Sequence, residues 1–511
     1  MSSQGLGGRQ RHHISVALIS AAVVFLVHAI GNPHYGFFRD ELYFIICGRH
    51  PQWGYVDQPP VVPLLAAATQ IFGHSLFLLR IVPAFFAAAG VYVTCVLAAE
   101  FGGGSFAQAL AAITYLFASV LMAFGTKVGP DEVGLWTWPL LALFLVRIIK
   151  GADARLWMPF GLVAGLSIES KYSVLFLLAA FLAGLLLTPE RRMLANLWVA
   201  AGAGVALIIA LPAFLWQAHY GFPMWELLEG GQHGKNIIVG PGLYLVQQLL
   251  ITNLFLAPVW IIGLVWLFRD TPNRFLGYAY VILILEMIVF HGKHYYPANV
   301  YPILIAAGAT QVERWTTARR VVRFAIVTYA LIFGIVFVPF SLPILPEETF
   351  LSYEAHIMGA MHITKSVLAT EHNREAAALP GDWADMHGWP QFAQTIKSVY
   401  DALPPAQRAQ AVVVTGNYGE ASAIEFFTPD VPVISGHNQY WLWGTRGYSG
   451  NVIIDVPGDC GGDTHLFKSA QLATRFNAPY TIGWETNIPI MVCRGIREPL
   501  SEIWPKIKRY I

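Results

Sequence analysis

The sequence is poor in charged residues. Of its 511 residues, 32 are Lys or Arg and 31 are Asp or Glu, so charged side chains make up 12% of the chain. Soluble globular proteins usually carry about 25%. A soluble chain of this length could not bury the accompanying 56% of hydrophobic residues, because much of its surface must face water. The composition therefore excludes an ordinary soluble protein and a disordered chain, and it predicts a membrane protein.

Two further scarcities narrow the class of protein. The net charge is +1 and no basic tract is present, which argues against a nucleic-acid partner. The four cysteines are too few for a disulfide scaffold. Cys460 and Cys493 would lie in an oxidising compartment in the topology derived below, so they are candidates for one disulfide. The sequence alone does not decide whether they pair.

Long apolar runs, by contrast, fill the first two-thirds of the chain. Most are long enough to cross a hydrocarbon core of about 30 Å as a helix. No small-residue cleavage site follows the first run, so we expect it to be a membrane span and not a signal peptide. We predict about eleven transmembrane helices, near residues 14–31, 77–99, 106–124, 133–150, 156–168, 172–187, 196–216, 243–268, 275–291, 297–312 and 321–343.

Lys and Arg are distributed unevenly between the connecting loops. With a cytoplasmic N-terminus, the inner loops hold about twice as many Lys and Arg as the short outer loops, as the positive-inside rule requires. An odd number of spans then places the C-terminal part of the chain on the outer side. The acidic residues of the membrane half collect on that same outer side.

The composition of the sequence changes after Pro346, where ordinary polarity and regular turn signals replace the long apolar runs. The segment AVVVTGNYGEASAIEFF predicts a strand at 411–414, a glycine-bearing turn and a helix from about 419, and 451–456 and 489–495 predict further strands. We therefore expect a transmembrane domain over 1–345 and a soluble extracytoplasmic α/β domain over 346–511. Within the second domain, GNYGEA could cradle a phosphate at a helix N-terminus. An ordinary strand–turn–helix junction is the more frequent use of such a segment.

The densest polar segment is FFRDELYFIICGRHPQWGYVDQPPVVPLL, after the first span. It contains the acidic pair Asp40–Glu41, and Asp57–Gln58 precede two prolines. We expect an amphipathic interfacial helix over 40–50, with Asp40 near its start, where the helix dipole favours negative charge. The alternative is that Asp40 only caps the helix. The adjacent Glu41 and the aromatic and acidic residues downstream favour a functional site.

Other outer loops repeat this combination of carboxylates and lysines. In GTKVGPDEVGLW, Lys127 precedes the pair Asp131–Glu132, which would otherwise be a simple helix N-terminus. Charged groups near lipid are costly and therefore tend to be functional. A lysine there can hold a phosphate or extend to the headgroups, and a tyrosine can belong to the interfacial aromatic belt. The further candidates of this kind are Lys171 and Tyr172 in SIESKYSVLF, and Lys293 and Tyr295 in FHGKHYYPANVYP.

The outer loop at about 217–242 is long and rich in glycine, which is typical of a mobile lid beside a site. It contains Glu226 and His233, and we count His233 as a candidate for contact with the donor or acceptor. Their spacing matches no strong metal motif. A divalent metal therefore stays an open alternative, with Asp57, Glu226 and His233 as its weak candidate ligands.

Several segments resemble one enzyme family, in the same order along the chain. They are FRDELYFIICGRHPQWGYVDQPPVVPLLAAATQIFG, GLVAGLSIESKYSVLFLLAAFLAGLLLTPERR, LPAFLWQAHYGFPMWELL and HGKHYYPANVYPILIAAGA. They are similar to blocks of the bacterial family-39-like glycosyltransferases. These are membrane enzymes of the GT-C fold, related to protein O-mannosyltransferases and lipid A aminoarabinose transferases. GNYGEASAIEFF followed by SGHNQYWLWG resembles the C-terminal region of a bacterial subset.

The resemblance implies a fold and a reaction. The fold would be a polytopic α-helical GT-C bundle followed by an α/β domain. The reaction would be an inverting transfer of a sugar from a polyprenyl-phosphate donor, on the outer side of the bacterial cytoplasmic membrane, to a lipid, glycan or protein acceptor. The family's catalytic acid would fall on Asp40, with Glu41 beside it, and the acid of its second outer loop on Asp131 or Glu132.

One position departs from the family pattern. In the aminoarabinose transferases the pair before the two prolines is an acidic residue and a lysine, linked to metal and lipid phosphate, whereas this chain has Asp57–Gln58. The phosphate contact would then pass to Lys127, Lys171 or Lys293. The mechanism that follows is direct displacement: Asp40 acts as general base on the acceptor hydroxyl, and lysines stabilise the leaving phosphate.

Two other classes of function compete with this interpretation. A transporter or flippase of lipid-linked sugars would also place charges in a multispan bundle. It should carry them near the midplane, on broken helices of repeated halves, whereas here they lie in outer loops. A non-catalytic lipid- or glycan-binding scaffold is the third class, and the paired acids argue against it.

Overall fold

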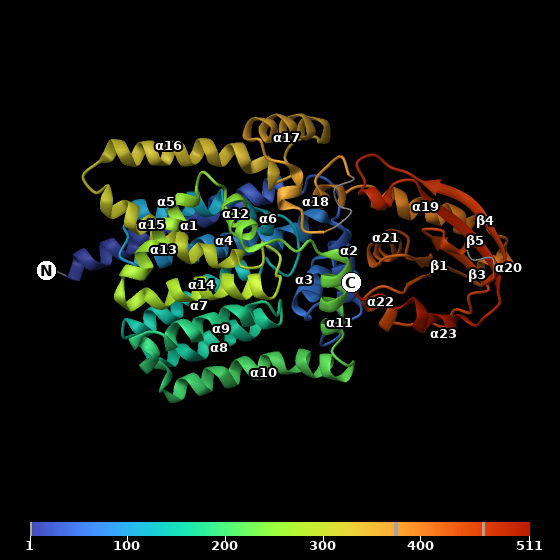
Figure 1. Cartoon of the computed structure of the whole chain (residues 1–511), viewed down its shortest axis with the longest axis horizontal. Helices are drawn as coiled ribbons and strands as arrows, with labels where there is room; N and C mark the ends of the chain where they lie inside the picture. Colours follow the sequence, from blue (N-terminus) through green and yellow to red (C-terminus); the bar gives the residue numbers. More distant parts are fainter. Residues whose placement is uncertain (1–2, 372–376, 462–464) are drawn as a thin grey trace. The chain divides into compact units, whose positions relative to one another are not determined.

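The computed structural model describes residues 3–371, 377–461 and 465–511 (Figure 1). The chain forms two compact units, each built from three separate segments. The helical unit consists of Met1–His34, Phe77–Phe214 and Ile238–Leu345. The mixed unit consists of Tyr35–Leu76, Leu215–Ile237 and Pro346–Ile511. The boundary between Leu345 and Pro346 lies where the composition of the sequence changes, but the mixed unit also contains two earlier segments.

The helical unit is a bundle of apolar helices, several of which run side by side (Figure 1). Among the residues that the structure describes, five stretches are long and apolar enough to cross a membrane: Ile14–Gly31, Leu76–Glu100, Leu197–His219, Thr271–Val289 and Arg320–Phe340. The helices that build it are α1 (Ser3–Gly31), α4 (Leu76–Glu100), α5 (Ser105–Leu116), α6 (Ser119–Phe124), α7 (Gly134–Ile149), α8 (Trp157–Ile168), α9 (Val174–Leu186), α10 (Leu197–His219), α12 (Pro241–Ile251), α13 (Ala257–Arg269), α14 (Arg274–Val289), α15 (Tyr301–Trp315) and α16 (Arg320–Phe337).

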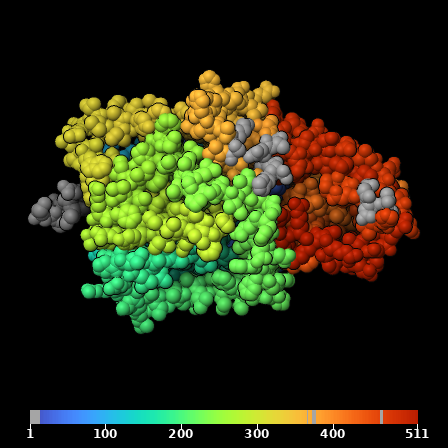
Figure 2. All heavy atoms as spheres, viewed as in Figure 1, coloured from blue at the N-terminus to red at the C-terminus, as the bar shows by residue number. Residues whose placement is uncertain are grey.

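The outer helices of this bundle expose apolar side chains that a soluble protein would bury. On α16, Val321 and Phe324 are 82% and 74% exposed, and Ile208 on α10 is 71% exposed. Helix α16 covers one edge of the helical unit in the space-filling view (yellow in Figure 2). Such surfaces are stable in hydrocarbon and not in water, so these helices face lipid.

The interior of the bundle is packed through close backbone contact. A side chain at Gly263 on α13 or Gly308 on α15 would collide with the backbone of the opposite helix. Small residues allow this approach where helices associate without a hydrophobic driving force from water.

Two predicted spans are each divided into two helices. The run at 106–124 forms α5 and α6 with a break at Phe117, and the run at 243–268 forms α12 and α13 with a break at Asn253. The amide nitrogen of Asn253 donates to the carbonyl oxygens of Phe117 (3.3 Å) and Phe333 (3.2 Å). The carbonyl group of Phe117, released by the break between α5 and α6, is thus satisfied inside the bundle. The predicted number of eleven spans stays a prediction.

The mixed unit is built around a five-stranded sheet with the order β2–β1–β3–β5–β4. β1 (Ala411–Thr415) pairs in parallel with β2 (Val433–Ser435) and β3 (Val452–Val456), while β5 (Ile488–Ile496) runs antiparallel to β3 and to β4 (Phe467–Phe476). The α/β prediction is confirmed, although β2 and β4 were not predicted. Its helices are α2 (Arg39–Arg49), α3 (Val61–Thr69), α11 (Pro223–Gly230), α17 (Glu347–Met361), α18 (Gly381–Ala384), α19 (Trp389–Asp401), α20 (Pro405–Arg408), α21 (Tyr418–Phe427), α22 (Gln439–Leu442) and α23 (Leu500–Ile503).

Helices cover both faces of this sheet, with α19 and α21 on one face and α23 on the other (Figure 1). Between α23 and the sheet, a core forms around Val412, Ile453 and Leu500. Cys460 and Cys493 in the same core form a disulfide. The pairing that the sequence left open is thereby resolved.

Candidate functional site

Helix α2 brings the first acidic pair into the mixed unit. It begins at Arg39, so Asp40 and Glu41 lie in its first turn, as predicted. The helix packs against α3 and α21, and most of its residues are buried. The expectation of an interfacial amphipathic helix is therefore wrong, because such a helix would leave one face to water or headgroups.

The Asp40 carboxylate is held by two donors. Its Oδ1 accepts a hydrogen bond from the Tyr418 hydroxyl (2.8 Å) and one from Arg39 Nε (3.2 Å). Burial raises the pKa of Tyr418 well above its usual range, so the phenol keeps its proton and remains the donor. The Arg39 guanidinium is itself anchored 3.8 Å from the buried carboxylate of Asp385. The Asp40 side chain stays 30% exposed, so a substrate hydroxyl can approach an oriented carboxylate.

Asp57 forms a second carboxylate centre in the same unit. Its Oδ1 accepts from the Tyr43 hydroxyl (2.9 Å), and its Oδ2 accepts from the amide nitrogen of Asn438 (3.4 Å). Burial, opposed by these hydrogen bonds, raises the pKa of Asp57 to about 6. The rings of Tyr43 and Tyr418 lie 4.5 Å apart and connect the two carboxylates through side-chain contacts. We call Asp40, Asp57, Tyr43, Tyr418 and Asn438 the carboxylate cluster.

The C-terminal part of the chain supplies two members of this cluster. Tyr418 is the first residue of α21, which Asn417 and Glu420 cap reciprocally through side-chain and backbone hydrogen bonds. GNYGEA is thus a capped strand–turn–helix junction, as in the alternative interpretation. Asn438 has a positive φ of 46°, a strained conformation for a residue with a side chain.

A separate cluster lies in the helical unit. Lys171 Nζ donates to Asp131 Oδ1 (2.7 Å) and lies 4.5 Å from the ring centre of Tyr296. The amide nitrogen of Asn299 donates to the backbone oxygen of Asp131 (3.0 Å), while its buried Oδ1 has no hydrogen-bond partner among the described residues. We call these residues the lysine cluster.

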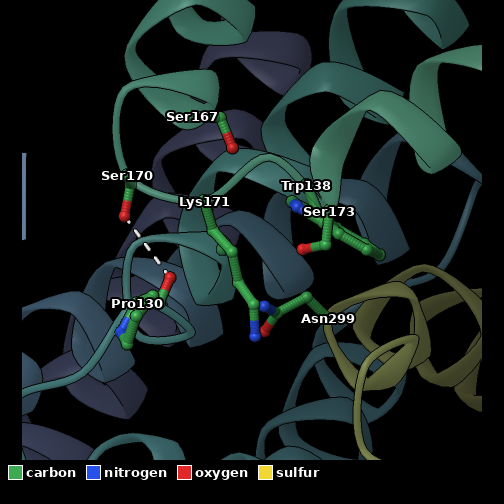
Figure 3. A pocket seen from close by; sticks show the side chains of 8 residues that line it. Pro130, Trp138, Ser167, Ser170, Lys171, Ser173 and Asn299 are labelled. Carbon is green, nitrogen blue, oxygen red and sulfur yellow. Dashed lines mark hydrogen bonds between the residues drawn. The ribbon is translucent and has the colours of Figure 1, made fainter. Parts of the chain in front are cut away.

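A small pocket adjoins the lysine cluster (Figure 3). In this view the Lys171 side chain extends toward Asn299. Ser170 donates to the backbone oxygen of Pro130 (3.3 Å) and closes one side. The pocket combines one cation with neutral polar groups, which suits an anionic oxygen. It is lined by Pro130, Gly134, Trp138, Ser167, Ser170, Lys171, Ser173 and Asn299.

Two predicted acids have structural hydrogen bonds. Glu41 is fully buried, and its Oε2 accepts from the backbone N–H of Phe38 (2.9 Å) at the start of α2. Glu132 is also buried, and its Oε2 accepts from the backbone N–H of Gly129 (2.8 Å). Glu41 therefore caps the helix, whereas the capping alternative had been considered for Asp40.

The remaining basic and aromatic candidates lie outside the pocket. Lys127, Lys293 and Tyr172 belong to the helical unit but do not line it. Tyr295 lies 5.8 Å from Lys171 Nζ, measured to its ring centre, and thus flanks the lysine cluster.

The metal candidates are not brought together among the residues that the structure describes. Glu226 Oε2 pairs with Lys508 Nζ (2.5 Å), and His233 Nδ1 lies 2.8 Å from the backbone oxygen of Glu229. Within the described ranges, no group of three His, Cys, Asp or Glu side chains is arranged to hold a metal ion.

Sequence reasoning missed Tyr43, Tyr418, Asn438 and Asn299 as site residues. Tyr418 and Asn438 do lie inside the GNYGEA and HNQYWLWG segments that the sequence analysis singled out. The sequence could not mark either residue as part of a site, because their partners Asp40 and Asp57 are about 380 residues away in the chain.

The chain is similar to known glycosyltransferases in part of its sequence. Residues 57–216 match the family described as dolichyl-phosphate-mannose-protein mannosyltransferase. The chain is 24% identical over 186 residues to the lipid A galacturonosyltransferase RgtD of Rhizobium johnstonii. That match covers 36% of this chain and 39% of the relative, so it spans less than half of either protein.

Solved structures extend the likeness to nearly the whole chain. The chain is similar to ArnT from Cupriavidus metallidurans bound to undecaprenyl phosphate, with a TM-score of 0.61 and 14% identity. For the apo state of that protein the TM-score is 0.58 and the identity is 13%. Each comparison covers 93% of this chain and 97% of the other. The chain is thus a membrane protein with the ArnT-like GT-C fold.

Proposed function

We propose that this protein is an inverting glycosyltransferase that uses a polyprenyl-phosphate sugar as donor. The observation that carries the proposal is the Asp40 carboxylate, which Tyr418 and Arg39 orient while it stays open to solvent. The GT-C fold and the similarity to a lipid A galacturonosyltransferase support the same class of reaction. The acceptor would be an envelope lipid, glycan or protein on the outer side of the cytoplasmic membrane.

In this proposal Asp40 is the general base. It takes the proton of an acceptor hydroxyl while that oxygen bonds to the anomeric carbon, and the bond from that carbon to the phosphate oxygen breaks. The sugar configuration inverts because attack and departure occur on opposite faces. The polyprenyl phosphate leaves as an anion, so no strong general acid is required.

Within the helical unit, Lys171 is proposed to bind a lipid phosphate. Its ammonium group already neutralises Asp131, and a phosphate oxygen would share this charge. The small polar pocket beside it offers further neutral groups to the phosphate. A lipid of this type suits a helical unit with exposed apolar helices, because its chain needs an apolar environment.

The proposal is tested with purified full-length protein in proteoliposomes. Undecaprenyl phosphate carrying galacturonate or mannose is supplied with lipid A, and release of undecaprenyl phosphate is measured. We expect wild-type release to fall at least a hundredfold in Asp40→Asn, since a positioned general base contributes about 10²–10⁴ to the rate. Asp430→Asn, at an exposed ion pair with Lys397, is the matched control and should keep wild-type activity.

Near wild-type turnover of Asp40→Asn would refute the base assignment. Movement of the sugar-loaded lipid across the bilayer, with no release of undecaprenyl phosphate, would instead favour the flippase class.

A further inference from the structure

Gln58 carries an unpaired polar group inside the mixed unit. Its side chain is 2% exposed, and neither its amide nitrogen nor its amide oxygen has a hydrogen-bond partner among the described residues. Leaving a buried donor or acceptor unpaired is costly, because the group has given up its hydrogen bonds to water. Buried polar groups are therefore almost always paired, and each exception calls for an explanation.

Two other buried amides near this turn are paired, unlike that of Gln58. Gln439 is fully buried, and its Oε1 accepts from the backbone N–H of Val56 (3.1 Å). Gln217 is 3% exposed, and it donates to the backbone oxygen of Tyr55 (2.9 Å) and accepts from the backbone N–H of Met224 (3.2 Å). Both paired amides hold the backbone of the turn that carries Gln58.

This turn is also closed on itself. The backbone oxygen of Gln58 accepts from the backbone N–H of Tyr55 (2.9 Å), and two prolines with fixed φ follow. Gln58 therefore cannot find a partner by a simple shift of its backbone. The preceding residue is Asp57, so the unpaired amide is adjacent in sequence to the carboxylate cluster.

We propose that Gln58 recognises a pair of hydroxyl groups on the transferred sugar. The inference rests on the proposed function and names the part of the donor that this side chain contacts. An amide with both ends unpaired needs a ligand that accepts from its nitrogen and donates to its oxygen, as two sugar hydroxyls do. An ionised phosphate offers only acceptors and would leave the amide oxygen unpaired. Because protein covers both amide atoms, a neighbouring side chain must move when the sugar binds.

The test compares wild type, Gln58→Met and Gln217→Met as full-length protein in detergent. Each is titrated with undecaprenyl phosphate alone and with undecaprenyl phosphate carrying galacturonate or mannose, and binding is followed by tryptophan fluorescence. We expect Gln58→Met to weaken binding of the sugar-loaded lipid about tenfold or more, because both hydrogen bonds to the sugar are lost. Binding of the sugar-free lipid should stay within twofold.

The melting temperatures provide an independent measurement. Gln58→Met removes an unpaired polar group and should raise the melting temperature, whereas Gln217→Met breaks paired bonds and should lower it without changing the preference between the two lipids. A side chain that only supports the structure would not combine gained stability with lost selectivity.

Three results would overturn the inference. If Gln58→Met weakens binding of both lipids equally, Gln58 contacts the phosphate. If it leaves binding of both lipids unchanged, the amide contacts water and not the donor. A wild type that binds the two lipids equally would remove any contribution from the sugar. If wild type prefers the sugar-loaded lipid but never releases undecaprenyl phosphate, the proposed function fails while this inference stands.

Discussion

Replacing Asp57 by Asn should stabilise the protein at neutral pH and not at acid pH. Burial raises the pKa of this carboxyl from 3.8 to about 6. A group with a raised pKa contributes stability that is fully present below its unfolded pKa and is lost as the pH rises through the folded pKa. The shift of roughly two pH units, at about 1.4 kcal/mol each, corresponds to about 3 kcal/mol lost by pH 7.

Asn does not ionise, so the variant avoids this loss. It has one acceptor oxygen where the carboxylate has two, and it therefore loses one of the bonds from Tyr43 and Asn438, worth about 1 kcal/mol. The net gain at pH 7 is about 2 kcal/mol. Below pH 4, where the wild-type carboxyl is neutral, the variant should be less stable by about 1 kcal/mol. The difference in stability thus changes sign between these pH values.

The assay is thermal unfolding of both proteins in detergent at half-unit steps from pH 4 to pH 7.5. About 2–4 °C per kcal/mol is expected for a unit of 150–250 residues. Asp57→Asn should therefore melt about 4–8 °C above wild type at pH 7 and slightly below it at pH 4. Two melting curves that run parallel over the whole range would refute the assigned pKa and the burial that causes it.

Three further results are expected. Lys171→Met should raise KM for the lipid-linked donor about 10–100-fold, since a bond to a charged group contributes about 1.5–3 kcal/mol. Steady-state kinetics measure this KM, and an unchanged value would refute the assignment. Tyr418→Phe removes the hydroxyl that orients Asp40 and should lower kcat about tenfold with little change in KM or melting temperature, whereas a kcat that falls together with the melting temperature would point to damaged folding. Reduction of the disulfide between Cys460 and Cys493, 33 residues apart, should destabilise the mixed unit by about 3–4 kcal/mol, because the bridge restricts the unfolded chain. Thermal unfolding with and without reductant measures this, and an unchanged melting temperature would contradict it.

Membrane character and most helix positions could be predicted, because both depend on composition summed over long runs. The break in the run at 106–124 could not. No glycine or proline marks it in the sequence, and the carbonyl oxygen of Phe117 is satisfied by Asn253, far along the chain. Strand β4 was missed for a similar reason. It is an edge strand with mostly exposed side chains, so its sequence carries little hydrophobic signal.

Some features of the candidate site could likewise be predicted from the sequence and others could not. Asp40, Asp57, Asp131 and Lys171 could be selected from the sequence because charges are rare in apolar surroundings. The sequence could not show that Glu41 caps a helix while its neighbour Asp40 accepts a hydrogen bond from Tyr418. That distinction depends on the side chain of Tyr418, which only the folded chain brings within 2.8 Å of Asp40.

The three-segment construction of the mixed unit sets an order for biogenesis. Asp40 and Asp57 leave the ribosome early, but their partners Tyr418 and Asn438 are made 378 and 381 residues later. The intervening membrane helices must be inserted before these contacts can form. A nascent or truncated chain therefore carries the carboxylates without their orienting donors. The carboxylate cluster is therefore completed only after the membrane helices between its two halves have been made.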